Sequence, residues 1–415
     1  MSQTPGWSTP HWPEDVPHTI SGYEKPLFAV LDESARDFPD RVFTVFSGAS
    51  RTFAQVKETA DRIANFLNSR GLKRGDRVAV FLPNLPHYPP IYFGILKAGC
   101  VCVTCNPLYT AKELNFQLKD CGAKAVFCMD HPQFYPTTVK ALEGSAVKTV
   151  VICGVKSYLP KLKGILGGLL GKIPKAGSYE PGHLFFDEAV ASARPQPPQL
   201  TVDPLQDIAL IVYTGGTTGV PKGACLTHSN LAANLAAIDV WMRLVHEPGA
   251  APERQRRGGF HTYLGVLPWY HIFGMTCAML SACASGSRLI CVPDPRAGKP
   301  PFTEVLKIVQ TLRPTLMPAV PTLFMAFHNH PQLEQYDLTS FMGCFSGGAP
   351  LPPDVCRRFA AKTGSVIFEG HAFSETSPVC TTFSLLAAIR LHSSREMASY
   401  ALPLSHFSIS SAGDD

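Results

Sequence analysis

Short apolar runs alternate with stretches of helical spacing through the first third of the chain. Apolar side chains recur with the period of a helix at Phe53, Val56, Ala60, Ile63, Ala64 and Leu67. Gly71 ends this predicted helix, and further helices are predicted from about Pro90 to Lys97 and after the capping residue Thr110. Buried strands are predicted at 77–82, 99–104 and 123–128. Strands that alternate with helices are typical of a parallel α/β sheet.

The same alternation continues beyond a proline-rich linker at 193–204. Further strands are predicted at 208–212, 263–268, 288–292, 315–318, 341–345 and 365–368. Helices are predicted at 230–244 and 302–312, and a polar surface loop at 248–259. A chain of 415 residues is long enough for two or three domains.

The composition is that of an ordinary globular protein, with 45% apolar and 17% charged residues. The net charge of +5 comes without a dense block of Lys and Arg, so it gives no support to nucleic-acid binding. Thirteen cysteines without regular spacing, behind an N-terminus that is no secretory signal, predict a reducing compartment. We expect an intracellular protein, in the cytoplasm or peripheral on an organelle membrane, the peroxisome included.

Three cysteines close together, Cys100, Cys102 and Cys105, allow two interpretations. One is a metal site. The other is a strand whose alternate residues share a face, with cysteine acting as a small buried hydrophobe. No matching pair of His or Cys residues lies nearby in the sequence, which favours the strand.

The segment 159–175 mixes apolar residues with four lysines and four glycines. It reads either as a basic amphipathic segment that rests on a lipid surface, or as a solvated insertion or a helix packed on its own domain. The glycines weaken the prediction of a helix. We favour the second interpretation, a solvated insertion or a helix packed on its own domain, and keep peripheral membrane contact as the alternative.

The stretch 213–223, Tyr-Thr-Gly-Gly-Thr-Thr-Gly-Val-Pro-Lys-Gly, has the chemistry of a phosphate cradle. Its glycines let backbone N–H groups approach an anion, its threonines add hydroxyl donors and Lys222 adds a positive charge. It is not a Walker A loop, because Pro221 precedes the lysine and Gly223 follows it. The helix that follows is predicted to have Ser229 or Asn230 as its N-cap.

This string resembles the phosphate-binding signature of the adenylate-forming superfamily, and together with 223–231 it is most similar to long-chain fatty acid–CoA ligases. The stretches 71–80, 97–110 and 269–274 resemble other motifs of these enzymes. Residues 369–376 resemble the superfamily's Gly-Tyr-Gly-x-Thr-Glu motif. In that motif His371 stands for Tyr, Ala372 for Gly and Ser374 for Thr, while Glu375 is kept.

The resemblance implies roles for particular residues. Phosphate binding falls to Thr214, Gly215, Gly216, Thr217, Thr218, Gly219 and Lys222. Adenine binding falls to Gly347, Gly348, Ala349, Pro350, Glu369, Gly370, His371, Ala372, Phe373 and Ser374. The acyl pocket is implied at Trp269, Tyr270, His271 and Phe273, for which capping or core packing is the alternative. A carboxylate that faces a triphosphate needs a cation, so Mg²⁺ is implied on Thr214 and Glu375. Thr214, Lys222 and Glu375 are the implied catalytic residues.

The implied fold is α/β: an adenylate-forming N-terminal domain with two α/β subdomains and a partial β-barrel subdomain. We expect a lead-in at 1–29, this domain at 30–382 and an unrelated tail at 383–415. The family would continue into a ribose-binding Asp, a hinge and a small C-terminal domain with an essential Lys, and we expect these to be missing. A truncated isoform or a gene model that reads through an intron would explain the tail.

The implied activity is ATP-dependent activation of a long-chain fatty acid to an acyl-adenylate and then to acyl-CoA. Its substrates are the fatty acid, ATP and CoA, with Mg²⁺ as the metal. We expect thioester formation to suffer more than adenylation from the missing domain. Two alternatives stay open: a ligase for another acid, such as a coumarate-like aromatic or a medium-chain acid, and a non-catalytic nucleotide- or acyl-binding remnant. Chain length and oligomeric state are not predicted.

Overall fold

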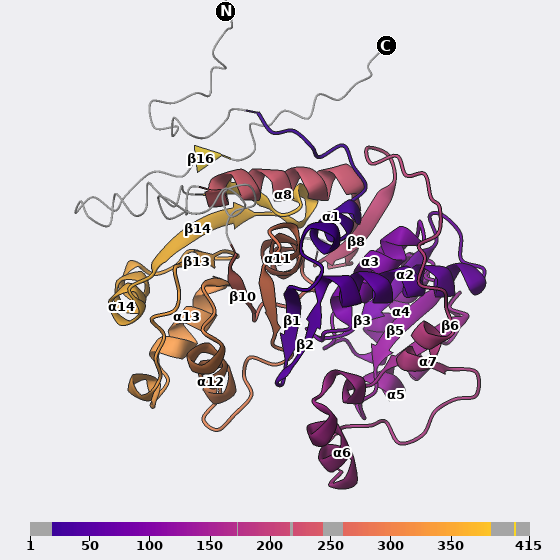
Figure 1. Cartoon of the computed structure of the whole chain (residues 1–415), viewed down its shortest axis with the longest axis horizontal. Helices are drawn as coiled ribbons and strands as arrows, with labels where there is room; N and C mark the ends of the chain where they lie inside the picture. Colours follow the sequence, from indigo (N-terminus) through magenta and orange to yellow (C-terminus); the bar gives the residue numbers. More distant parts are fainter. Residues whose placement is uncertain (1–18, 172, 216–218, 244–259, 383–401, 404–415) are drawn as a thin grey trace, which may run out of the picture.

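The chain folds around two mixed β-sheets with helices on their faces (Figure 1). The computed structural model describes residues 19–171, 173–215, 219–243, 260–382 and 402–403. The lead-in up to residue 18, the tip of the phosphate motif at 216–218, the predicted loop at 248–259 and nearly all of the tail lie outside the described residues.

The first sheet has seven strands in the spatial order β7-β6-β5-β3-β4-β8-β9. They are β3 (Arg77–Phe81), β4 (Val101–Thr104), β5 (Ala125–Met129), β6 (Thr149–Cys153), β7 (Leu184–Phe185), β8 (Ile208–Thr214) and β9 (Lys222–Thr227). The helices of this part are α2 (Phe53–Ser69), α3 (Tyr88–Lys97), α4 (Ala111–Asp120), α5 (Phe134–Ala141), η1 (Val155–Tyr158), α6 (Lys161–Leu169) and α7 (Phe186–Ala191). The strands are parallel except for β8 and β9, which pair antiparallel.

The second sheet has the order β16-β15-β14-β13-β12-β10-β11-β1-β2. Its strands are β1 (Val42–Phe46), β2 (Ala49–Thr52), β10 (Thr262–Gly265), β11 (Arg288–Cys291), β12 (Leu316–Ala319), β13 (Gly343–Ser346), β14 (Val366–Ala372), β15 (Val379–Thr382) and β16 (Leu402–Pro403). Its helices are α1 (Ala29–Asp37), α8 (His228–Arg243), α10 (Ile272–Gly274), a π-helical turn η2 (Met275–Leu280), α11 (Ser281–Ala284), α12 (Thr303–Leu312), α13 (Pro321–His328), η3 (Leu333–Gln335), α14 (Pro353–Thr363) and η4 (Ser374–Thr376). The predicted pair of α/β units is confirmed. The barrel-like part stays a prediction, since the described residues end in the antiparallel strands β14, β15 and β16.

The strands of the first sheet contribute side chains to two hydrophobic cores, one on each face of the sheet, because successive side chains point to opposite faces. Val78 and Val80 face a cluster that includes α2 and α3, whereas Ala79 and Phe81 face α4 and α5. The predicted capping residue Thr110 is confirmed, and Glu113 completes a capping box with it.

The three clustered cysteines pack into these cores. Cys100 and Cys102 join the cluster of α2 and α3, and Cys105 lies in the cluster on the other face. Burial raises the pKa of Cys100 to about 12, so its thiol stays protonated. The prediction that these residues pack as small hydrophobes is confirmed.

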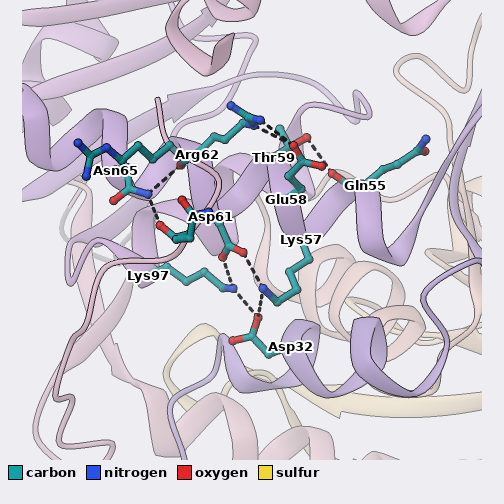
Figure 2. A network of polar contacts seen from close by, with 11 residues as sticks. Asp32, Gln55, Lys57, Glu58, Thr59, Asp61, Arg62, Asn65 and Lys97 are labelled. Carbon is teal, nitrogen blue, oxygen red and sulfur yellow. Dashed lines mark hydrogen bonds and ion pairs between the residues drawn. The ribbon is translucent and has the colours of Figure 1, made fainter. Parts of the chain in front are cut away.

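A buried ion network joins helices α1, α2 and α3 (Figure 2). The ammonium of Lys97 lies 2.5 Å from one carboxylate oxygen of Asp61 and also contacts Asp32. Lys57 approaches the second oxygen of Asp61 at 2.6 Å. The side chains of Lys97 and Asp61 are only 3% and 2% exposed. Helices α2 and α3 are therefore tied by an ion pair that water scarcely reaches, and the partly exposed Asp32 and Lys57 extend the network to α1.

Candidate active site

The phosphate motif forms the end of an antiparallel hairpin. Strand β8 runs into the motif, strand β9 leaves it, and Thr214 pairs with Lys222 across the hairpin. Strand β9 was absent from the sequence prediction, which led from the motif into a helix. Gly216, Thr217 and Thr218 lie outside the described residues, while Gly215, Gly219 and Lys222 are exposed. The exposed glycines and the ammonium can meet an anion without moving side chains aside.

Two contacts fix the hairpin at its base. A Cβ on Gly223 would lie 2.8 Å from the Ile211 side chain and 3.3 Å from the ring of Tyr213. Glycine is therefore required at this position of β9, where it pairs with β8. The hydroxyl of Tyr213 donates to a carboxylate oxygen of Asp120, at the end of α4, over 2.5 Å. Burial and this hydrogen bond raise the pKa of Tyr213. The phosphate strand is thus held to the helix layer beside it.

Helix α8 begins earlier than predicted. Asn230 N–H donates to Thr227 Oγ1 over 3.2 Å, and Thr227 N–H donates to Asn230 Oδ1 over 2.9 Å. Thr227 is therefore the N-cap and Asn230 the third helical residue, which corrects the prediction of Ser229 or Asn230. The error follows from the missed strand, because β9 delivers the chain directly to Thr227.

The strand that carries Lys222 lies next to the turn that carries Glu375. Strand β9 packs beside η4, and the side chains of Lys222 and Glu375 are both exposed. Asn234 on α8 holds the segment after η4, where its amide donates to Val379 O over 2.9 Å and to Thr376 O over 3.3 Å. The structure thus places the strand that begins at Lys222 beside the turn that carries Glu375, and Thr214 pairs with Lys222 in the hairpin.

The two predicted adenine segments also meet. Strands β13 and β14 are parallel neighbours, and a Cβ on Gly347 would lie 3.0 Å from Phe273 and 3.3 Å from Gly370 O. The carboxylate of Glu369 accepts a hydrogen bond from Leu351 N–H over 2.8 Å, which holds the loop after β13. Of the other predicted adenine residues, Gly348, Ala349, Pro350, His371 and Phe373 are exposed, and Ala372 and Ser374 are half-buried.

The predicted acyl-pocket residues are not equivalent. Trp269 is fully buried, and its ring meets Tyr88 edge to face. Tyr270 is half-buried. Phe273 packs with Leu267 and Cys277 against Val320 and Val379, and it lies 3.0 Å from the Cβ position of Gly347, so this motif meets the predicted adenine loop and the segment after Glu375.

His271 is the N-cap of α10. Its Nδ1 accepts a hydrogen bond from Phe273 N–H over 3.3 Å, so the neutral ring carries its proton on Nε2. The ring keeps an exposed edge, yet the atoms packed around it lower the pKa of His271 by desolvation. A neutral ring with a free Nε2–H can donate to a substrate oxygen.

Sequence reasoning missed Asn84 as a positioning residue. Its buried amide donates to Gly265 O over 2.9 Å and to Leu267 O over 2.7 Å, and it accepts from Trp269 N–H over 2.8 Å. Asn84 follows β3 of the first sheet, and its partners follow β10 of the second. One side chain therefore sets where the 265–269 segment lies relative to the first sheet.

Gly274 offers a direct test of this packing. A Cβ at this position would lie 2.3 Å from Pro268 O and 2.8 Å from Leu267 O. We expect Gly274→Ala to lower the free energy of unfolding by about 1–3 kcal/mol, because rigid backbone has to move. Chemical denaturation would measure it. Gly168→Ala is the matched control, since nothing lies within 4 Å of a Cβ there, and equal midpoints for the two variants would contradict the packing.

Magnesium would find oxygen ligands here. Mg²⁺ is usually held by one or two carboxylates together with substrate phosphates and water. The exposed carboxylate of Glu375 and the hydroxyl of Thr214 fit that donor set. No group of three or more His, Cys, Asp or Glu side chains suited to a metal occurs in the described part of the chain.

The sequence matches the family described as AMP-binding enzyme over residues 31–410. The chain belongs to this family. It is 38% identical over 380 residues to the long-chain-fatty-acid–CoA ligase of Bacillus subtilis (strain 168), covering 89% of this chain and 63% of that protein. It is 33% identical over 377 residues to the long-chain-fatty-acid–CoA ligase of Escherichia coli O157:H7, covering 89% and 64%. This family member thus spans slightly less than two thirds of these curated relatives.

Solved structures share the fold of this AMP-binding chain. A long-chain-fatty-acid-CoA ligase from Archaeoglobus fulgidus matches with a TM-score of 0.71 at 21% identity, covering 90% of this chain and 69% of that one. The inhibitor-bound N-terminal domain of FACL13 from Mycobacterium tuberculosis matches with a TM-score of 0.65 at 23% identity, covering 88% and 80%. At this level of identity the likeness concerns the fold.

Proposed function

We propose that this chain activates a long-chain fatty acid with ATP, forming an acyl-adenylate and pyrophosphate. The observation that carries the proposal is the meeting of the phosphate hairpin with η4, in a chain 38% identical to a long-chain-fatty-acid–CoA ligase. A fatty carboxylate oxygen attacks the α-phosphorus of ATP, and the bond to the pyrophosphate oxygen breaks. A CoA thiolate then attacks the acyl carbon, and AMP leaves. The second step belongs to the same proposal.

The residues of this chain act in the first step by position and charge. The backbone of the hairpin and the ammonium of Lys222 would hold the departing phosphates and neutralise their charge. Bound Mg²⁺, on Glu375 and Thr214, would add positive charge beside the phosphate oxygens. The exposed residues Gly348, Ala349 and Pro350 would offer backbone to a flat ring, while Gly347 lets the ring of Phe273 pack close beneath them.

The acyl side of the site is assigned to the 269–273 turn. The exposed edge of His271 and the half-buried ring of Tyr270 lie where this turn meets the adenine loop through Phe273. Trp269 supports the turn from within the core. All thirteen cysteines are free thiols, which fits the proposed intracellular location. The acid substrate partitions into bilayers, and contact with a lipid surface through 159–175 would accompany the activity without being required for it.

Pyrophosphate release tests the proposed function. The purified chain is supplied with Mg·ATP and saturated fatty acids of increasing length, with and without CoA. We expect release to depend on the acid and to rise with chain length, because a longer acyl chain buries more apolar surface. Faster release with an aromatic or a medium-chain acid would mean that this acid, and not a long-chain fatty acid, is the substrate. ATP binding without acid-dependent release would mean that the chain only binds nucleotide.

A further inference from the structure

Helix α6 presents an apolar face to solvent. The side chains of Leu162, Ile165, Leu166 and Leu170 are 70%, 56%, 48% and 64% exposed. Their spacing places them on one side of a helix. Figure 1 shows α6 projecting from the body of the molecule at its lower edge. Single exposed hydrophobic residues are normal, but four within nine residues call for a partner.

The same segment carries an excess of positive charge. Five lysines and no acidic residue occur between Gly154 and Ser178, namely Lys156, Lys161, Lys163, Lys172 and Lys175. The whole chain has 37 basic and 32 acidic residues, so the remainder is balanced. The net positive charge of the sequence is therefore concentrated in the segment that carries this apolar face.

Hydrogen bonds on both sides hold this segment outward. Arg51 donates to Ser157 O over 2.8 Å before the helix, and Lys163 Nζ donates to Ser47 O over 3.2 Å from within it. After the helix, Asp130 accepts from Ala176 N–H and from the hydroxyl of Tyr179, both over 2.8 Å. These contacts fix the base of the segment and leave its apolar face uncovered.

We propose that this face, Leu162, Ile165, Leu166 and Leu170, docks on an anionic lipid bilayer. Apolar side chains enter the boundary between headgroups and acyl chains, and the surrounding lysines attract the anionic headgroups. None of the described helices has the length and apolarity to cross a bilayer, so the contact is peripheral. The inference extends the proposed function, whose substrate dissolves in bilayers, but docking itself requires no ATP and no turnover.

Vesicle co-sedimentation of the full chain tests the docking. The probes are vesicles of phosphatidylcholine alone and of phosphatidylcholine mixed with phosphatidylglycerol. We expect binding to the mixed vesicles to weaken as salt rises, and the double variant Ile165→Glu/Leu166→Glu to bind them about tenfold more weakly or worse. Leu205→Glu is the control, because Leu205 is 52% exposed outside this segment and should bind like the parent chain.

A second variant separates charge from apolar contact. Lys156 and Lys175 are exposed, and none of the hydrogen bonds that anchor the segment involves their side chains. Lys156→Gln/Lys175→Gln should weaken binding to anionic vesicles and flatten its salt dependence, without changing binding to neutral ones. Unchanged vesicle binding by both double variants would overturn the proposal. If Ile165→Glu/Leu166→Glu instead abolished self-association in light scattering, the partner would be a second copy of this chain.

Pyrophosphate release keeps this inference distinct from the proposed function. The Ile165→Glu/Leu166→Glu variant should release pyrophosphate at the parental rate when the acid is supplied in solution. If the parent chain binds vesicles but releases no pyrophosphate, the docking proposal is supported and the proposed ligase activity is contradicted. If it releases pyrophosphate but binds no vesicles, the ligase activity is supported and the docking proposal is contradicted.

Discussion

Replacing Lys97 by Met lowers the free energy of unfolding by about 3 kcal/mol, because it leaves the buried carboxylate of Asp61 without its closest partner. Removing one member of a buried ion pair typically costs about 3–5 kcal/mol. Lys57 remains 2.6 Å from Asp61, which places the expected cost at the lower end. Urea denaturation of the parent and of Lys97→Met measures the difference.

Two further variants test the buried network itself. Lys97→Met/Asp61→Leu should recover part of the lost stability, because a buried ion pair replaced by apolar residues of similar size is often close to neutral. Lys307→Met removes an exposed ion pair with Glu304 and should leave the denaturation midpoint unchanged. A midpoint for Lys97→Met equal to that of the parent would show that the network contributes nothing measurable.

Replacing Glu375 by Gln slows fatty-acid-dependent pyrophosphate release by on the order of 10²–10³-fold, the usual effect of removing one preorganised charge contact. Glu375 is exposed beside the strand that carries Lys222, so its carboxylate has no structural partner to lose among the described residues. The amide keeps the shape of the side chain and removes its charge. We also expect more Mg²⁺ to be needed for half-maximal release.

Glu334→Gln is the control for this charge change. Glu334 lies on η3, its side chain is 86% exposed, and it pairs with Lys362. Its replacement should leave pyrophosphate release and magnesium dependence unchanged. Equal release by Glu375→Gln and the parent chain would contradict the proposed role of Glu375, and a shifted denaturation midpoint would point to structural damage instead.

Local pattern predicted four of the seven strands of the first sheet, β3, β4, β5 and β8, and missed β6, β7 and β9. The prediction of 77–82 became β3 at Arg77–Phe81, and 123–128 became β5 at Ala125–Met129. Strands buried on both faces read as continuous apolar runs, which few other elements imitate. Strand β9 has no such run, since glycine and lysine open it and its side chains are mostly partly exposed. This strand forms because it pairs with β8, and a short stretch of sequence does not reveal that pairing.

Candidate site residues can be recognised in the sequence where a short string carries them, whereas contacts between remote residues cannot. The phosphate motif, the predicted adenine segments and Glu375 all lie on recognisable strings, although the second strand of the hairpin was not predicted. Asn84 bonds to residues more than 180 positions later, and the sequence around it signals only the end of a strand. Lys97 is the last residue of an apolar helix, and the sequence around it does not indicate that it pairs with Asp32 and Asp61. Long-range polar contacts of this kind appear only once the fold is known.

Isotope exchange between pyrophosphate and ATP is the most direct test of acyl-adenylate formation. Exchange requires the first step to run forward and backward, and it needs no CoA. We expect labelled pyrophosphate to enter ATP only when a long-chain fatty acid and Mg²⁺ are present, and Glu375→Gln to suppress the exchange. Absence of acid-dependent exchange, from a folded chain that binds ATP, would contradict the proposal that this phosphate hairpin and Glu375 catalyse adenylation.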